Sequence, residues 1–202
     1  MTGVLLLVPL AYLLGTFPTA ALVARATGHD VMAEGSGNPG ASNVYRLAGW
    51  KAGLIVFVGD FAKGAIPSAA GLLLAGHLGA YVLGVAAVVG HVLPVVSRFR
   101  GGRGVATAAG VLAVIYPLIA LGLAIVWFVI ARGLGKASVA SLVVTIAFPV
   151  LVAATGNSWG DVVVTSVLAL VILARHLPNL RRLVRGEEPG LGQDPPGGSV
   201  SQ

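Results

Sequence analysis

The stretch that decides the fold runs from residue 52 to residue 75 and reads AGLIVFVGDFAKGAIPSAAGLLLA. A helix needs about 20 mostly apolar residues to cross the hydrocarbon core of a bilayer, and this run is long enough. Its two charged residues, Asp60 and Lys63, lie three positions apart and therefore on one face of a helix. We expect them to form a structural ion pair; a functional site is the alternative, because ionisable groups inside a membrane often mark one.

The rest of the chain has the same apolar character. Of its 202 residues, 56% are hydrophobic and only 10% are charged, and the mean hydropathy is +0.93. A soluble domain carries about 25% charged residues. The 10% in this chain would not suffice to cover the apolar surface of a soluble fold. The sequence therefore predicts an all-α integral membrane protein. Cysteine is absent, which excludes a disulfide framework and a thiol nucleophile.

Seven apolar segments are candidates for transmembrane helices. They span roughly residues 3–24, 52–75, 78–96, 105–116, 117–132, 138–155 and 160–177. The first has no basic n-region and no clear cleavage site, so we interpret it as a retained helix rather than a signal peptide. The segment 105–116 is short. It is either a half-helix or the first part of a span that continues beyond a break near Pro117.

Lysine and arginine predict the orientation of these helices. With the N-terminus outside, every Lys and Arg except Lys63 falls on the inner face, as the positive-inside rule requires. This bias explains the net charge of +6 without nucleic acid as a partner. We expect a cytoplasmic C-terminus and one membrane domain over residues 1–189. Residues 190–202 are rich in Gly, Pro and Ser, which predicts a disordered cytoplasmic tail.

Polar, glycine-rich segments gather on the predicted inner face, at residues 34–46 (EGSGNPGASNVYR), 90–107 (with GGRG at 101–104) and 175–188 (RHLPNLRRLVRGEE). Glycine lets backbone N–H groups approach an anion, and a helix that begins at Gly104 adds partial positive charge there. Arg46 and Arg103 then fit as clamps for phosphate oxygens. The alternative is a set of solvated turns whose arginines face lipid headgroups.

The same segments argue against other chemistry. GGRG does not have the spacing of a Walker A loop, so ATP is not the expected ligand. His91 and His176 have no further ligands at metal-binding spacing, and we predict no metal. A transporter of phosphorylated anions is the competing function. Such a protein usually places its polar site near the middle of the membrane, whereas these segments lie at one face.

Taken together and in this order, the three segments resemble the cytoplasmic motifs of the PlsY family. Its members are bacterial inner-membrane enzymes that acylate glycerol 3-phosphate with acyl phosphate as the donor. The resemblance covers about residues 12–188 and includes the Asp60, Lys63 and Gly64 of the second apolar segment. The motif residues are those at 36–43 (SGNPGASN), Arg46, Gly90, His91, Pro94, those at 101–107 (GGRGVAT), His176, Asn179, Arg182, Leu183, Gly186 and Glu188.

The resemblance implies roles for some of these residues and for Ser141. Catalytic roles fall on Ser36, Arg46, Arg103, His176 and Asn179. Substrate-binding roles fall on Asn38, Gly40, Asn43, Gly101, Gly102, Gly104, Thr107 and Ser141. Structural roles fall on Asp60, Lys63 and Glu188.

The resemblance also implies the reaction and its setting. The expected product is lysophosphatidic acid, inorganic phosphate leaves, and no cofactor is needed. The expected partners are the two substrates and the lipid bilayer, and we expect a monomer in the bacterial plasma (inner) membrane with its active site facing the cytoplasm. The family usually has Lys where this chain has Arg103, so an acyltransferase with another acceptor is a second alternative.

Overall fold

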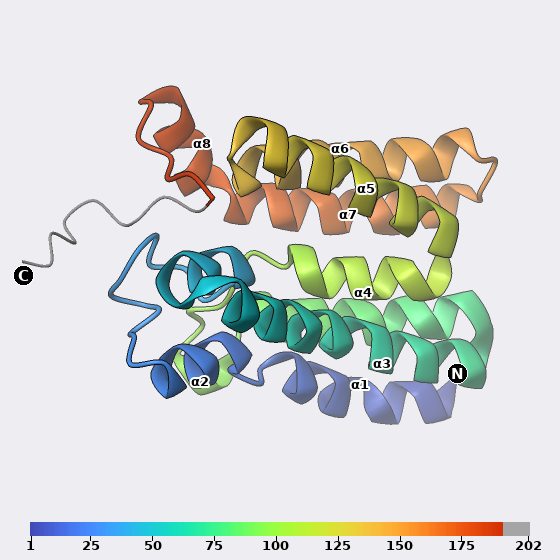
Figure 1. The fold of residues 1–202 in the computed structure, drawn as a ribbon. Helices are drawn as coiled ribbons and strands as arrows, with labels where there is room; N and C mark the ends of the chain where they lie inside the picture. Colours follow the sequence, from blue (N-terminus) through green and yellow to red (C-terminus); the bar gives the residue numbers. More distant parts are fainter. Residues whose placement is uncertain (192–202) are drawn as a thin grey trace, which may run out of the picture.

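The computed structural model describes residues 1–191, which form helices joined by loops (Figure 1). Most of the expected tail, residues 192–202, lies outside the described residues. The first two residues of that tail, Gly190 and Leu191, contact the body of the protein, since Leu191 N–H donates to Gly135 O at 2.5 Å. The helices are α1 (Thr2–Gly15), α2 (Thr19–Ala26), α3 (Ala41–Val92), α4 (Val105–Ile115), α5 (Pro117–Leu134), α6 (Ala137–Ala154), α7 (Trp159–Arg175) and α8 (Leu177–Val184), with a 3₁₀ turn at Val95–Ser97.

Their length and composition suit a membrane. Among the described residues, four helical stretches are long and apolar enough to cross a bilayer, namely Thr2–Ala26, Ala41–Ser97, α5 and α6. A fifth results if α7 and α8, which meet at a bend of 54°, count as one span. The prediction of an all-α membrane protein is therefore confirmed.

Helix α3 is a bent element rather than one rod. Gly49 has φ 82°, and this separates the first two turns from the long apolar part. Ala75 and Gly76 are also non-helical, and beyond them the chain turns back. Ser68 Oγ donates to Ala80 O at 3.1 Å across this turn. The result is a helical hairpin whose turn lies between the predicted segments 52–75 and 78–96.

Two predicted helix boundaries were wrong, both at proline. The second arm of the hairpin ends at Val92 rather than at residue 96, because Pro94 has no N–H to donate and pushes Leu93 out of the helical region. The N-terminal segment 3–24 is not one helix. It breaks between α1 and α2, just before Thr19, where Pro18 acts on Phe17 in the same way.

Helix α4 is the short helix that the sequence predicts near 105–116. Its 11 residues span about 17 Å, against a hydrocarbon core of about 30 Å. Tyr116 is non-helical with φ −133°, and α5 begins directly at Pro117. Figure 1 shows that α5 runs back antiparallel to α4. Helix α4 is therefore a separate short helix, and the alternative of one span broken near Pro117 is wrong.

Glycines allow the closest contact between α3 and α4. A side chain on Gly64 would meet the carbonyl oxygen of Thr107, and one on Gly110 would meet that of Phe61. Small residues at helix interfaces let backbones approach closely in membranes, where the hydrophobic effect does not drive helices together. These two glycines thus set the position of α4, whose first residue follows the GGRG loop.

We expect Gly64→Val and Gly110→Val each to destabilise the protein by about 1–3 kcal/mol through overpacking, which is a fall in Tm of about 2–12 °C for a chain of this size. Thermal unfolding of the purified protein in detergent measures this. Gly122→Val in α5 is the matched control, because a Cβ there meets nothing within 4 Å. An equal fall in Tm for all three variants would contradict this account of the interface.

Candidate active site

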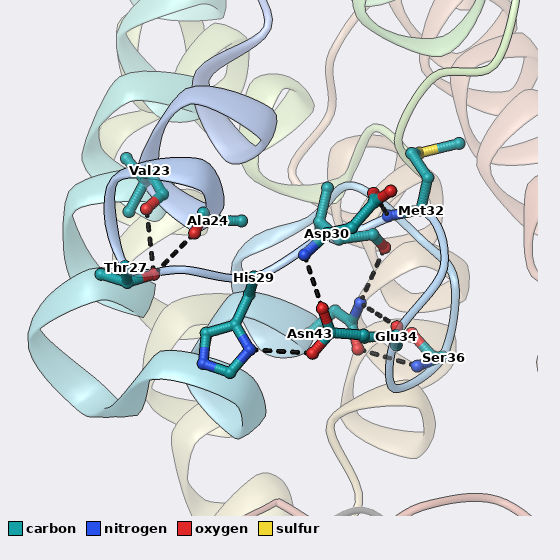
Figure 2. Close-up of polar contacts among 10 residues, drawn as sticks. Val23, Ala24, Thr27, His29, Asp30, Met32, Glu34, Ser36 and Asn43 are labelled. Carbon is teal, nitrogen blue, oxygen red and sulfur yellow. Dashed lines mark hydrogen bonds and ion pairs between the residues drawn. The ribbon is translucent and has the colours of Figure 1, made fainter.

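The loop from Thr27 to Gly40 is held by two side chains (Figure 2). Glu34 accepts from the Asp30 N–H at 2.6 Å, and its other oxygen lies 2.8 Å from His29 Nδ1. Asn43, at the start of α3, accepts from the Ser36 N–H at 2.8 Å. Its amide N–H groups donate to the carbonyl oxygens of Val31 at 3.2 Å and Glu34 at 3.1 Å. These bonds place Ser36 above the start of α3.

Asn43 supports Ser36. Its side chain is 1% exposed, and its polar atoms form hydrogen bonds within the loop, one of them to the Ser36 N–H. Ser36 Oγ itself is buried and has no hydrogen-bond partner among the described residues. Of the two, Ser36 is therefore the side chain with a polar group available for a ligand.

We expect Asn43→Ala to lower kcat by about tenfold or more, because slight misplacement of a positioned group is costly and the Ser36 N–H loses its acceptor. Initial rates of the purified variant measure this. Asn157→Ala is the control, since Asn157 also bonds to a backbone carbonyl, that of Val152, but in the loop before α7. A full rate for Asn43→Ala would mean that the loop holds its shape without this side chain.

The GGRG segment forms a second loop against the end of the α3 hairpin. Gly102 N–H donates to His91 O at 3.1 Å, and a Cβ on Gly102 would meet the His91 ring. Arg175 Nη2 donates to Gly101 O at 2.8 Å. Gly104, with φ 92°, then starts α4. The Gly102 N–H is thus engaged within the protein, and this glycine allows close packing against His91.

The third segment lies where α7 meets α8. The His176 side chain is buried, and its Nδ1 lies 2.8 Å from Ile172 O. Because a carbonyl oxygen only accepts, Nδ1 carries the proton and Nε2 keeps its lone pair in the neutral ring. Glu188 accepts from Asn179 Nδ2 at 2.6 Å and from Arg182 Nε at 2.8 Å. Burial raises the pKa of the Glu188 carboxyl, but the bonds from Asn179 and Arg182, the nearby Ser138 hydroxyl and the positive charge of Arg182 outweigh it and leave the pKa below its ordinary value.

The three segments meet at one end of the helix bundle (Figure 1) and enclose a pocket of about 220 Å³. The residues that line it are Ser36, Gly37, Asn38, Arg103, Ala174, Arg175, Pro178 and Arg182. Burial, together with neighbouring arginines, lowers the pKa of Arg103 to about 10, which still leaves it charged at neutral pH. The Arg103 guanidinium makes no hydrogen bond or ion pair within residues 1–191. Such a pocket suits an anion.

Several predicted site residues lie outside the pocket lining. Arg46 donates from Nε to Gly190 O at 2.7 Å and from Nη2 to Pro189 O at 3.2 Å. Ser141 accepts from Trp127 Nε1 at 3.0 Å, and Thr107 Oγ1 is fully buried without a partner in the described chain. The other expected residues outside the lining are Gly40, Asn43, Gly101, Gly102, Gly104, His176 and Asn179.

Asp60 and Lys63 lie on α3, inside the bundle. Lys63 Nζ is 2.6 Å from Asp60 Oδ1, and both side chains are buried. His91 Nδ1 is 3.8 Å from the same oxygen. Because the His91 ring also packs against Gly102, this cluster supports the loop that carries Arg103. Within residues 1–191, no group of three or more His, Cys, Asp or Glu residues could hold a metal ion.

Sequence reasoning did not assign three residues to the site. Arg175 and Arg182 line the pocket, and Ser138, in the first turn of α6, buries a hydroxyl without a partner in the described chain. The arginines stand in the third polar segment, but other arginines surround them. The family motif includes Arg182 and not Arg181, but the resemblance gave Arg182 no role. Helical spacing points to it as well, since Arg182 is three positions from Asn179 and shares its face.

Comparison with known proteins identifies the relatives of this chain. A family model described as glycerol-3-phosphate acyltransferase matches residues 5–186. The chain is 44% identical to the glycerol-3-phosphate acyltransferase of Rubrobacter xylanophilus, over 96% of its own length and 98% of that protein. It is 39% identical to the protein of the same name from Geobacter sulfurreducens, over 93% and 97% of the two chains.

Solved structures agree with the sequence relatives. The crystal structure of PlsY, an integral membrane glycerol 3-phosphate acyltransferase, in its glycerol 3-phosphate form has a TM-score of 0.89 at 37% identity, over 94% of this chain and 96% of that one. The lysophosphatidic acid form has a TM-score of 0.86 at 36% identity, over 93% and 95%. Similarity of this extent, in a chain whose glycine- and arginine-rich segments meet at one pocket, shows that the protein belongs to the PlsY family of integral membrane glycerol-3-phosphate acyltransferases.

Proposed function

We propose that the protein transfers a fatty acyl group from acyl phosphate to the sn-1 hydroxyl of glycerol 3-phosphate, giving lysophosphatidic acid and inorganic phosphate. The observation that carries this proposal is the pocket in which Ser36, Arg103 and Arg182 meet at one end of the bundle. The relatives with solved structures are named for a glycerol 3-phosphate form and a lysophosphatidic acid form, which are acceptor and product of this reaction.

The chemistry needs mainly positioning and charge neutralisation, because acyl phosphate is already a reactive mixed anhydride. The sn-1 hydroxyl oxygen attacks the acyl carbonyl carbon, the bond from that carbon to the phosphate oxygen breaks, and the departing phosphate takes the hydroxyl proton. Arg46 and Arg103 neutralise the two phosphates. Ser36 and Ser141 donate hydrogen bonds, and Asn179 orients the substrates.

His176 is the rival base for that proton, since its Nε2 keeps a lone pair when Nδ1 donates to Ile172 O. A His176→Gln variant separates the two routes. If the phosphate takes the proton, the variant keeps a wild-type dependence of kcat on pH, even where its rate is lower. If His176 takes it, the acidic limb of the profile disappears.

The proposed reaction is tested directly with purified protein in detergent, given acyl phosphate and glycerol 3-phosphate. We expect lysophosphatidic acid and inorganic phosphate in equal amounts, and no product when acyl-CoA replaces acyl phosphate. No lysophosphatidic acid under conditions in which the Rubrobacter relative is active would overturn the assignment. Uptake of glycerol 3-phosphate into proteoliposomes without formation of lysophosphatidic acid would favour the transporter alternative. Turnover with a different phosphorylated acceptor would favour the alternative of an acyltransferase with another acceptor.

The membrane arrangement that we propose has seven spans, with the N-terminus outside and the active site and C-terminus in the cytoplasm of a bacterial inner membrane. The α3 hairpin supports two spans within Ala41–Ser97. Helix α4 is shorter than the hydrocarbon core, and we count it as a span because α5 runs back antiparallel to it. The natural chain has no cysteine, so single cysteines report topology cleanly. We expect a membrane-impermeant maleimide to label Thr155→Cys from outside and Glu187→Cys only from inside; the reverse pattern would contradict this orientation.

A further inference from the structure

Arg182 carries the feature of the site that the reaction scheme above leaves unused. Its Nε donates to Glu188 Oε2 at 2.8 Å, and Glu188 is 6% exposed. Its Nη2 is buried and has no hydrogen-bond partner among residues 1–191, and the side chain lines the pocket. A buried cationic N–H without an acceptor is costly, so this nitrogen is suited to a partner that arrives with a ligand.

The other arginines around the pocket are engaged differently. Arg46 donates to the carbonyl oxygens of Pro189 and Gly190, and Arg175 donates to that of Gly101. Arg103 has no bond within the described chain. Arg182 is thus the one of these four whose guanidinium is held in orientation by a carboxylate while a second nitrogen remains unpartnered. A fixed planar guanidinium is preorganised for an oxyanion.

The same carboxylate holds a second residue. Glu188 accepts from Asn179 Nδ2 through its other oxygen, and Asn179 Oδ1 is buried without a partner in the described chain. Helix α8 is only eight residues long and begins at the bend after α7. Glu188 therefore determines where both side chains of this helix point.

We propose that Arg182 is a substrate-binding residue whose Nη2 donates to a phosphate oxygen in the pocket that Arg103 also lines, and that Glu188 positions it. This inference rests on the proposed acyl transfer. The phosphate belongs either to glycerol 3-phosphate or to acyl phosphate, since both present the same oxyanion. Three arginines, Arg103, Arg175 and Arg182, line this pocket, and such a concentration of positive charge matches a reaction that brings two phosphates together.

The test measures KM for each substrate separately in Arg182→Gln. A hydrogen bond to a charged group corresponds to about a 10- to 150-fold change in binding, so we expect the KM for one substrate to rise by that factor. The substrate whose KM rises is the one that Arg182 binds. Arg181→Gln is the matched control, because Arg181 is the neighbouring arginine on the same helix, is exposed and lies outside this pocket.

Arg182→Gln leaves the buried Glu188 charge without its partner, so the fold needs a separate check. The double variant Arg182→Gln with Glu188→Gln removes both charges and leaves an amide oxygen to accept from Asn179. Thermal unfolding shows whether the double variant folds. Calorimetric titration with inorganic phosphate measures binding without turnover. We expect weaker phosphate binding in the folded double variant, by about tenfold or more.

The outcomes are distinct. If the folded double variant keeps both KM values within about threefold of wild type and binds phosphate as wild type does, Arg182 has only a structural role and the inference is wrong. If the wild-type protein makes no lysophosphatidic acid but binds inorganic phosphate, and the double variant binds it more weakly, the proposed function fails while the phosphate site stands.

Discussion

Arg103→Ala is expected to lower kcat/KM for glycerol 3-phosphate by about 100- to 1,000-fold, the cost typical of removing one preorganised group from developing negative charge. The Arg103 guanidinium lines the pocket, makes no bond within the described chain and lies among other arginines. Burial lowers its pKa to about 10, so it is protonated at neutral pH. We expect the phosphate of the substrate to neutralise this charge. Steady-state rates with both substrates varied measure the effect.

Arg103→Lys tests what the guanidinium adds to the charge. Lysine keeps the positive charge but not the planar fork that binds two oxygens at once. We expect a much smaller loss than for alanine, of about tenfold or less, because the charge itself carries most of the effect. Arg100→Ala is the control, since Arg100 is exposed in the same connection. An unchanged KM for glycerol 3-phosphate in Arg103→Ala would mean that Arg103 does not clamp the acceptor.

Breaking the buried pair of Asp60 and Lys63 is expected to destabilise the protein by about 3–5 kcal/mol, because either single substitution leaves an uncompensated charge inside the bundle. The two groups are 2.6 Å apart and buried. We therefore expect Asp60→Leu and Lys63→Met each to lower Tm strongly and to reduce activity, since His91 links this pair to the GGRG loop. Denaturant unfolding in detergent measures the stability.

The double variant Asp60→Leu with Lys63→Met separates structure from function. Replacing a buried pair by apolar side chains of similar volume is often neutral or stabilising, so the double variant is expected to recover most of the stability. Lys51→Met, which removes an exposed charge beside Trp50, is the control. A double variant that is stable and yet inactive would favour the functional role that the sequence leaves open for this pair.

The sequence alone predicts where the helices lie and which loops matter, because these depend on local patterns. Hydropathy marks the apolar segments, and the short apolar run at 105–116 predicts that α4 is a short helix. Glycine beside arginine marks the three polar segments. Its errors are local too. The breaks before Thr19 and after Val92 come from prolines whose effect on the preceding residue outweighs an apolar run.

What only the tertiary structure decides is which polar atoms meet. Arg46 and Gly190 are 144 positions apart in the chain and bond directly. Arg182 stands among several similar arginines, yet its side chain lines the pocket and its buried Nη2 has no partner within residues 1–191. Asn43 stands in a motif that predicts substrate binding, and its side chain forms hydrogen bonds within its own loop. Hydrogen bonds are short and directional, so a residue's role in such a site depends on packing between distant segments. Composition and spacing along the chain determined the membrane helices and the motifs of this protein. They do not specify how distant segments pack, so the pocket was determined only by the fold.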